Sequence, residues 1–139
     1  MNKAMYKSLF CLPLLIVAFI LVLLPDSASC TVAVDAGQVM QVTFAYFDST
    51  YFGYTNFAPL FTAVAATTAL VLLAVYCFTR WYWFANAARH ILFGGIVFSF
   101  MPLLFSYRHL TTVGVLITVT MVADLSLIHF LIKEPNTNP

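Results

Sequence analysis

The sequence predicts an all-α membrane protein, a four-transmembrane-helix bundle with a short β-hairpin in its first extracellular loop. Three observations lead to this fold class: an apolar composition, four long stretches without Lys or Arg, and a period-two pattern between the first and second stretches. Of the 139 residues, 63% are hydrophobic and 8% are charged, whereas about 25% are charged in ordinary soluble domains. A net charge of +1 offers no basic surface for nucleic acid. Most of the apolar surface is therefore expected to face lipid.

The four apolar stretches cover residues 8–24, 57–78, 91–107 and 110–132. A helix needs roughly 20 residues to cross about 30 Å of hydrocarbon, a length that the second stretch reaches and the first does not. Because the bilayer core offers no water to backbone groups, each stretch is expected to be helical. The whole chain is therefore expected to form a single integral membrane domain.

The basic residues are distributed unevenly around these stretches. If the N-terminus is cytoplasmic, five of the six lie inside and only Arg108 lies outside. Cytoplasmic loops usually carry the excess of Lys and Arg. The sequence thus predicts a multi-pass protein of the cell membrane with both its N- and C-termini in the cytoplasm. The five inner residues are Lys3, Lys7, Arg80, Arg89 and Lys133.

Four consecutive aromatic residues, Trp81 to Phe84, follow the second stretch. Amphipathic rings prefer the headgroup layer, so these residues are expected to anchor the cytoplasmic end of the bundle. The third stretch is expected to begin after them, at about Ile91.

The first stretch has a second interpretation, as a secretory signal. Lys3 and Lys7 precede an apolar run that is followed by the small residues Ser27-Ala28-Ser29, and Cys30 invites a lipoprotein interpretation. The lipoprotein match is poor, because Ser27 occupies a position where an aliphatic residue is usual. Retention as a helix is favoured, since the run is long for a signal core and the charge distribution agrees with it. Cleavage near Cys30 is the alternative.

The expected extracellular loop, residues 25–56, contains the predicted hairpin. Asp35-Ala36-Gly37 has the composition of a turn, and Gly37 accommodates a positive φ. Because an isolated two-stranded hairpin is marginal, it is expected to lie on the outer mouth of the bundle, with its edge short or covered. Apolar residues of one parity flank the turn, as in a strand: Val32, Val34, Met40, Val42, Phe44 and Tyr46.

Aromatic residues are dense in FDSTYFGYTNFAPLF, residues 47–61. One interpretation is an outer aromatic belt that leads into the second helix. The other is a recognition surface, because aromatic rings are frequent at protein contacts. The candidate outer contact surface comprises Tyr46, Tyr51, Phe52 and Tyr54.

The stretch FAYFDSTYFGYTNFAPL, residues 44–60, followed by three apolar helices, resembles small four-helix membrane proteins of Gram-positive bacteria to which no function is assigned. This resemblance implies a fold and no activity. In topology outline only, four helices with a strand-bearing first outer loop are also similar to the claudin arrangement. The tryptophan and paired cysteines of a claudin's first loop are absent from residues 25–56, where Cys30 is the only cysteine. We therefore do not expect this protein to have the barrier or adhesion function of claudins.

Asp124 is the one acidic residue inside the apolar stretches. It lies about 12 Å from the cytoplasmic end of the fourth helix at 1.5 Å per residue. Intramembrane acids are costly, so Asp124 is expected to face the bundle, either as a neutral hydrogen-bonding group or as a proton or ion site. The hydroxyl groups expected near its depth complete a candidate intramembrane polar site: Ser99, Thr67, Thr68 and Thr120.

The sequence contains no catalytic constellation, cofactor motif or metal-ligand spacing. His90, His109 and His129 are distributed over both membrane faces, without Cys or carboxylate at ligand intervals. We therefore expect a protein that is not an enzyme and binds no cofactor, metal or nucleic acid. It is expected to act as an interaction or accessory component, in contact with membrane lipid and with a partner membrane protein or a second copy. The alternative is a small transporter or channel subunit that uses Asp124.

Overall fold

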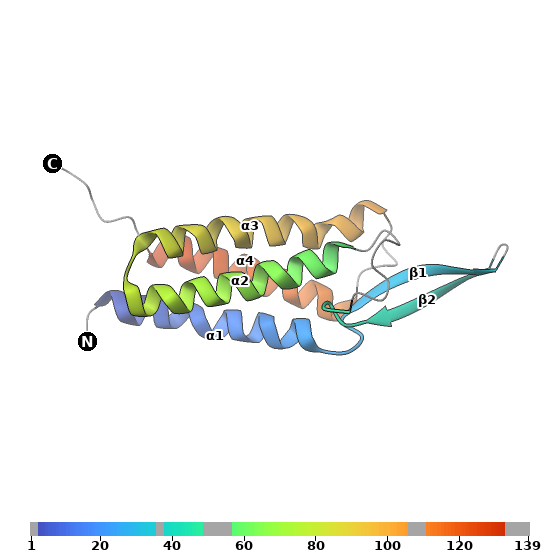
Figure 1. The fold of residues 1–139 in the computed structure, drawn as a ribbon, viewed down its shortest axis with the longest axis horizontal. Helices are drawn as coiled ribbons and strands as arrows, with labels where there is room; N and C mark the ends of the chain where they lie inside the picture. Colours follow the sequence, from blue (N-terminus) through green and yellow to red (C-terminus); the bar gives the residue numbers. More distant parts are fainter. Residues whose placement is uncertain (1–2, 36–37, 49–56, 106–110, 133–139) are drawn as a thin grey trace.

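The computed structural model describes residues 3–35, 38–48, 57–105 and 111–132 (Figure 1). These residues form four helices and a two-stranded antiparallel hairpin, so the predicted fold class is confirmed. The helices lie side by side, and the hairpin extends from one end of the bundle (Figure 1). In chain order the elements are α1 (Lys3–Leu23), β1 (Ala28–Asp35), β2 (Gln38–Phe44), α2 (Phe57–Thr79), α3 (Tyr82–Phe105) and α4 (Thr112–Leu131).

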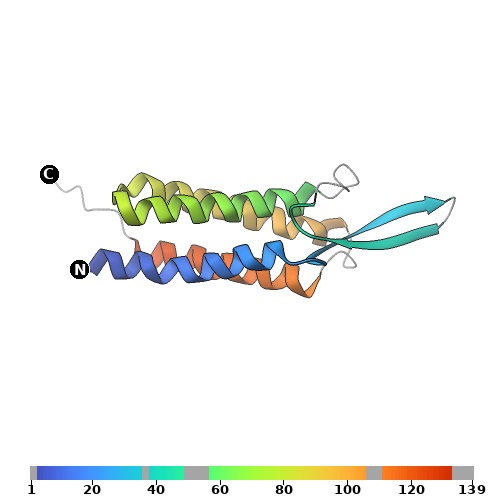
Figure 2. The same ribbon diagram turned by 60° about the horizontal axis from the view of Figure 1, so that its bottom comes forward.

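Each helix packs against two neighbours, in the cyclic order α1, α2, α3, α4. Of the four seams, the one between α3 and α4 is the least closely packed. We call the end of the bundle that carries the hairpin the hairpin end. The opposite end, where α1 begins, α4 ends and α2 turns into α3, is the turn end (Figure 2).

Many small side chains are buried in the interior of the bundle, together with large ones such as Leu73 and Met121, and many large apolar side chains are exposed on its outside. Ala66 and Ala88 are fully buried, whereas Phe78 and Leu104 are 88% and 81% exposed. Soluble domains seldom expose contiguous apolar surface, while membrane helices approach each other through small residues and present large ones to lipid. Among the described residues, three helical segments are long and apolar enough to span a membrane, and α1 adds a shorter apolar segment, Phe10–Leu23. The three are Phe57–Thr79, Tyr82–Met101 and Thr112–Leu131.

The third helix begins earlier than the sequence predicted. It starts at Tyr82 rather than at about Ile91, so most of the aromatic run belongs to its first turn. Arg80 adopts a positive φ of 59°, the left-handed conformation that commonly ends a helix, and its amide donates to the Tyr76 carbonyl at 2.9 Å. The prediction failed because Arg89 and His90 interrupt the apolar run. Hydropathy predicts which residues contact lipid. A helix is held by backbone hydrogen bonds, so it can continue through polar residues such as Arg89 and His90.

The hairpin has the predicted strands, with Ala28 opposite Phe44 and Val32 opposite Met40. Of the predicted turn, Asp35 ends β1, and residues 36 and 37 lie outside the described residues. On the apolar face, exposure rises from 4% at Ala28 to 57% at Met40. Only the root of the hairpin, the end of the two strands around Ala28 and Phe44, therefore packs on the bundle. The rest projects beyond the helices instead of lying across them as expected (Figures 1 and 2).

Candidate functional site

Asp124 lies on the face of α4 that turns into the bundle. Its side chain is 0% exposed, as are Met121 and Ile128, which lie one turn away on the same face. The expectation that Asp124 faces the interior is confirmed. Neither of its carboxyl oxygens has a hydrogen-bond partner among the described residues. A polar group in this position normally has a partner, so Asp124 is a strong candidate for a functional group.

The Cys11 side chain of α1 lies near Asp124, in the half of the bundle toward the turn end. The Cys11 thiol of α1 is buried and interacts electrostatically with Asp124 and with Cys77 of α2. Tyr76, also in α2, interacts with the same two cysteines. Cys11 is therefore the described side chain that links the Asp124 carboxyl group to Cys77 and Tyr76 of α2.

The hydroxyl groups that the sequence placed near Asp124 bond elsewhere. Ser99 pairs with the Thr118 hydroxyl at 2.7 Å, which links α3 to α4. Thr67, Thr68 and Thr120 donate to backbone carbonyls three or four residues earlier in their own helices. None of the four bonds to Asp124. Depth along a helix did not predict the hydrogen-bond partners, because it ignores the direction in which each side chain points and the carbonyl that a helical threonine reaches locally.

The proposed outer contact surface needs a correction at Tyr46. Its side chain is only 6% exposed, and a methyl group at Gly114 of α4 would lie 3.0 Å from its phenol oxygen. Tyr46 is thus a packing residue at the hairpin end, and burial raises its pKa to about 12. The other members of the predicted surface, Tyr51, Phe52 and Tyr54, lie outside the described residues.

Thr111 connects the root of the hairpin to α4. As the N-cap of the helix, its hydroxyl accepts a hydrogen bond from the Gly114 amide at 2.9 Å. The same hydroxyl donates to the Ser27 carbonyl, just before β1. At the neighbouring root of the hairpin, the Thr43 hydroxyl of β2 donates to the Asp26 carboxylate. The Thr111 bond therefore ties the root of the hairpin to α4, and the Thr43 bond ties β2 to the connection between α1 and β1.

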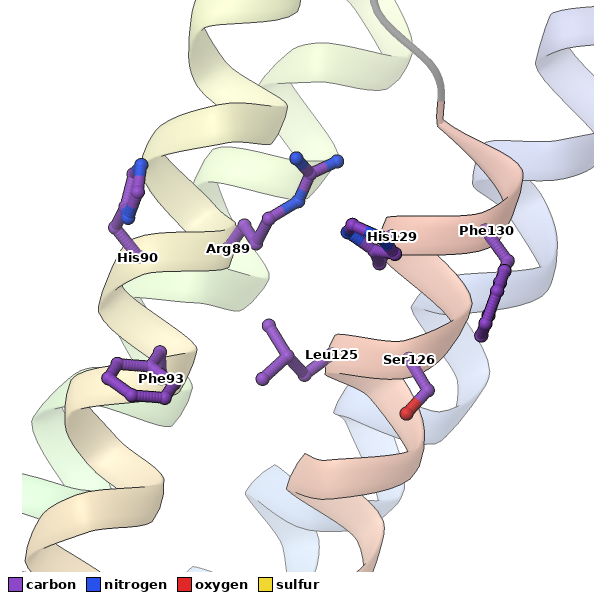
Figure 3. A pocket seen from close by; sticks show the side chains of 7 residues that line it. All are labelled: Arg89, His90, Phe93, Leu125, Ser126, His129 and Phe130. Carbon is purple, nitrogen blue, oxygen red and sulfur yellow. The ribbon is translucent and has the colours of Figure 1, made fainter.

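A groove of about 480 Å³ opens between α3 and α4 near the turn end (Figure 3). Its nitrogen-bearing side chains, Arg89, His90 and His129, lie toward the turn end of these helices. Farther from that end the lining is mainly apolar. The groove was missed in the sequence because Arg89 and His90 were placed outside the third apolar stretch. The remaining lining residues are Phe93, Leu125, Ser126 and Phe130.

Arg89 reaches across the groove from α3 to α4 (Figure 3). Its Nη2 donates to the Ile132 carbonyl at 3.1 Å, at the C-terminal end of α4. This carbonyl is one of those that a helix end leaves without an intrahelical partner, and it lies at the negative pole of the helix dipole. The Nε of Arg89 is buried and has no hydrogen-bond partner among the described residues.

Within the described part of the chain, no three His, Cys, Asp or Glu side chains gather as a metal site. The described residues thus include three candidate sites: a buried carboxyl group, a basic and apolar groove, and a projecting hairpin. No protein-family model, no curated protein and no solved structure matches the chain.

Proposed function

We propose that the protein is a multi-pass component of the cell membrane that acts as an accessory protein, through contact with another membrane protein or a second copy of itself. The hairpin carries this proposal, because it extends well beyond the helix ends (Figure 2). A structural role within the bundle would require only the buried root. The basic residues favour an orientation with the turn end in the cytoplasm and the hairpin outside.

The hairpin has the properties of a recognition element. Thr31, Gln41 and Thr43 are exposed on one face, and Met40 is exposed on the other. Each described strand pairs with only one other strand, so each leaves an edge to which an extended segment of a partner can add. The bonds of Thr111 and Thr43 hold the root in place. Such preorganisation lowers the entropy cost of binding.

A transporter or channel subunit is the second candidate, and Asp124 is the observation that favours it. A buried carboxyl group without a hydrogen-bond partner among the described residues is a candidate proton or ion site. The groove between α3 and α4 does not include Asp124 in its lining. The accessory role is therefore preferred, since it uses a surface that is already exposed.

Site-specific photo-crosslinking in native membranes tests the accessory role. A photoreactive residue at Gln41 samples the hairpin, and one at Val71, which is 56% exposed on α2, samples the outside of the bundle. We expect a discrete protein adduct from Gln41 and mainly lipid adducts from Val71. The Gln41 adduct should weaken when Thr31, which pairs with Gln41, is changed to Asp. Equal protein adducts from both positions, or none from Gln41, would refute the proposal.

A further inference from the structure

We infer that the groove between α3 and α4 is a binding site for one anionic phospholipid, with its phosphate at the basic end and the start of an acyl chain along the apolar part. The site requires that the helices span the membrane. It does not depend on the identity of any partner of the hairpin. The groove opens on the outside of the bundle, where lipid lies around a membrane-spanning protein (Figure 3).

Arg89 supplies a positive charge to the lining of the groove. Its recorded partner within the described residues is the carbonyl of Ile132, a neutral group. Its buried Nε is a donor that has no acceptor there. A guanidinium in a partly buried, lipid-facing position is costly without an anion. Its planar set of donors suits phosphate, which accepts two parallel hydrogen bonds from it.

The two histidines extend this basic end. His90 follows Arg89 on α3, and His129 lies across the groove on α4, facing the guanidinium (Figure 3). Both are exposed, and an imidazole in any protonation state offers at least one N–H donor. His129 therefore adds a donor on the same side as the guanidinium, while His90 adds one on the other side of α3 (Figure 3). Among the described residues, none that lines the groove is acidic.

The apolar part explains why the ligand is a lipid rather than free phosphate. Phe93 is 60% exposed and Phe130 is 71% exposed, and both line the groove together with the half-buried Leu125. Inorganic phosphate would leave these apolar surfaces uncovered, whereas an acyl chain would cover them. A volume of about 480 Å³ accommodates the headgroup and the first part of one chain. The rest of the lipid remains in the bilayer.

The location agrees with this ligand. Arg89 and His90 occupy the third turn of α3, and His129 lies in the last turn of α4, so the basic end is at the turn end of the bundle. Under the proposed orientation this end lies at the cytoplasmic leaflet. Basic pockets between membrane helices on that side are a known mode of binding for anionic headgroups.

Native mass spectrometry of the full-length protein tests the site. Phosphatidylglycerol is the probe, and phosphatidylcholine with the same acyl chains is the zwitterionic comparison. We expect one phosphatidylglycerol to bind at saturation, with an affinity about tenfold higher than that for phosphatidylcholine, because charge-assisted hydrogen bonds distinguish the two. Equal affinity for the two lipids would overturn the inference. Displacement of phosphatidylglycerol by millimolar inorganic phosphate would indicate a phosphate site instead, which also overturns it.

Variants with matched controls locate the binding. Arg89→Gln should lower the affinity for phosphatidylglycerol about tenfold or more, since it removes a charged donor. Arg80→Gln, a change of an exposed arginine that does not line the groove, should leave it within about twofold. Equal losses from the two variants would exclude the groove as the site.

A second pair of variants tests the apolar part and does not depend on Arg89. Phe93→Ser should weaken binding of a long-chain phosphatidylglycerol, because Phe93 lines the groove. Phe78→Ser changes a phenylalanine that is exposed outside the groove and should have little effect. If Arg89→Gln fails to fold, this comparison still decides the question. An unchanged affinity of the Phe93 variant would count against an acyl chain in the groove.

Discussion

The hydroxyl of Thr111 donates to the main-chain carbonyl of Ser27, a residue 84 positions earlier in the chain. This bond joins the start of α4 to the root of the hairpin. Because the same hydroxyl also caps α4 through the Gly114 amide, one side chain fixes both elements. The outward direction of the hairpin thus depends on a contact at the hairpin end of the bundle.

Thr111→Val should loosen the hairpin root. The change leaves the Gly114 amide and the Ser27 carbonyl without this partner, and loss of a helix N-cap typically costs about 1 kcal/mol. We expect a lower free energy of unfolding and faster amide hydrogen exchange in β1. Thr112→Val, at the exposed neighbouring position, is the control. Equal behaviour of the two variants would show that the contact is dispensable.

Gly95 and Gly94 provide a matched pair for the packing of α2 against α3. A methyl group at Gly95 would lie 2.7 Å from both the Ala65 Cβ and the Met121 Cε, whereas one at Gly94 would meet nothing within 4 Å. Gly95→Ala should lower the free energy of unfolding by about 1–3 kcal/mol through overpacking. Gly94→Ala should be neutral or slightly stabilising, because alanine favours the helix. Unfolding in detergent micelles measures both, and equal stability would contradict the close approach.

Tyr46 should titrate separately from exposed tyrosines. Burial raises its pKa from 10.0 to about 12. Because the pKa is higher in the folded protein, this group contributes stability that is fully present below pH 10. That contribution is lost as the pH rises toward 12. Absorbance of ionised tyrosine, compared between the wild type and Tyr46→Phe, isolates the transition. A difference spectrum with a midpoint near pH 10 would show that the phenol is not buried.

Asp124→Asn separates the accessory role from the transport alternative. The amide keeps the shape of the side chain and cannot ionise. If the protein acts through its hairpin, the Gln41 adduct and the free energy of unfolding should remain nearly unchanged. Loss of proton or ion flux in reconstituted vesicles, with the hairpin adduct preserved, would instead favour a transport function. The two measurements on one variant therefore distinguish the two proposals.

The sequence predicted α2 almost to the residue and placed the start of α3 too late. The apolar run of α2 coincides with its helix, so hydropathy and helix bounds agree there. In α3 the first turns contain Asn86, Arg89 and His90, which lower the hydropathy without breaking the helix. The groove escaped prediction for this reason, since Arg89 and His90 were placed outside the third apolar stretch.

The burial of Asp124 was predictable and its surroundings were not. The cost of a carboxyl group in lipid requires that it face the bundle, whichever helices surround it. The identity of its neighbours depends on which helix packs against which. Here α4 packs between α1 and α3, so Cys11 of α1 interacts with Asp124, while Ser99 of α3 pairs with Thr118. Spacing along one helix does not contain that information.

Cys30 is unsuitable as a reporter of orientation, although the sequence places it in the extracellular loop. Its side chain is only 2% exposed in β1, so a thiol reagent would not reach it in the folded protein. Thr43 is exposed in β2 and Arg80 is exposed in the turn between α2 and α3. Cysteines at these two positions report on opposite ends of the bundle.

Labelling of intact cells with a membrane-impermeant thiol reagent tests the central claim, that the helices span the membrane with the hairpin outside. The variants are Thr43→Cys and Arg80→Cys, each in a background in which Cys77 is replaced by alanine. We predict labelling of Thr43→Cys in intact cells and of Arg80→Cys only after the membrane is permeabilised. Labelling of the Arg80 variant in intact cells, with protection of the Thr43 variant, would contradict the orientation.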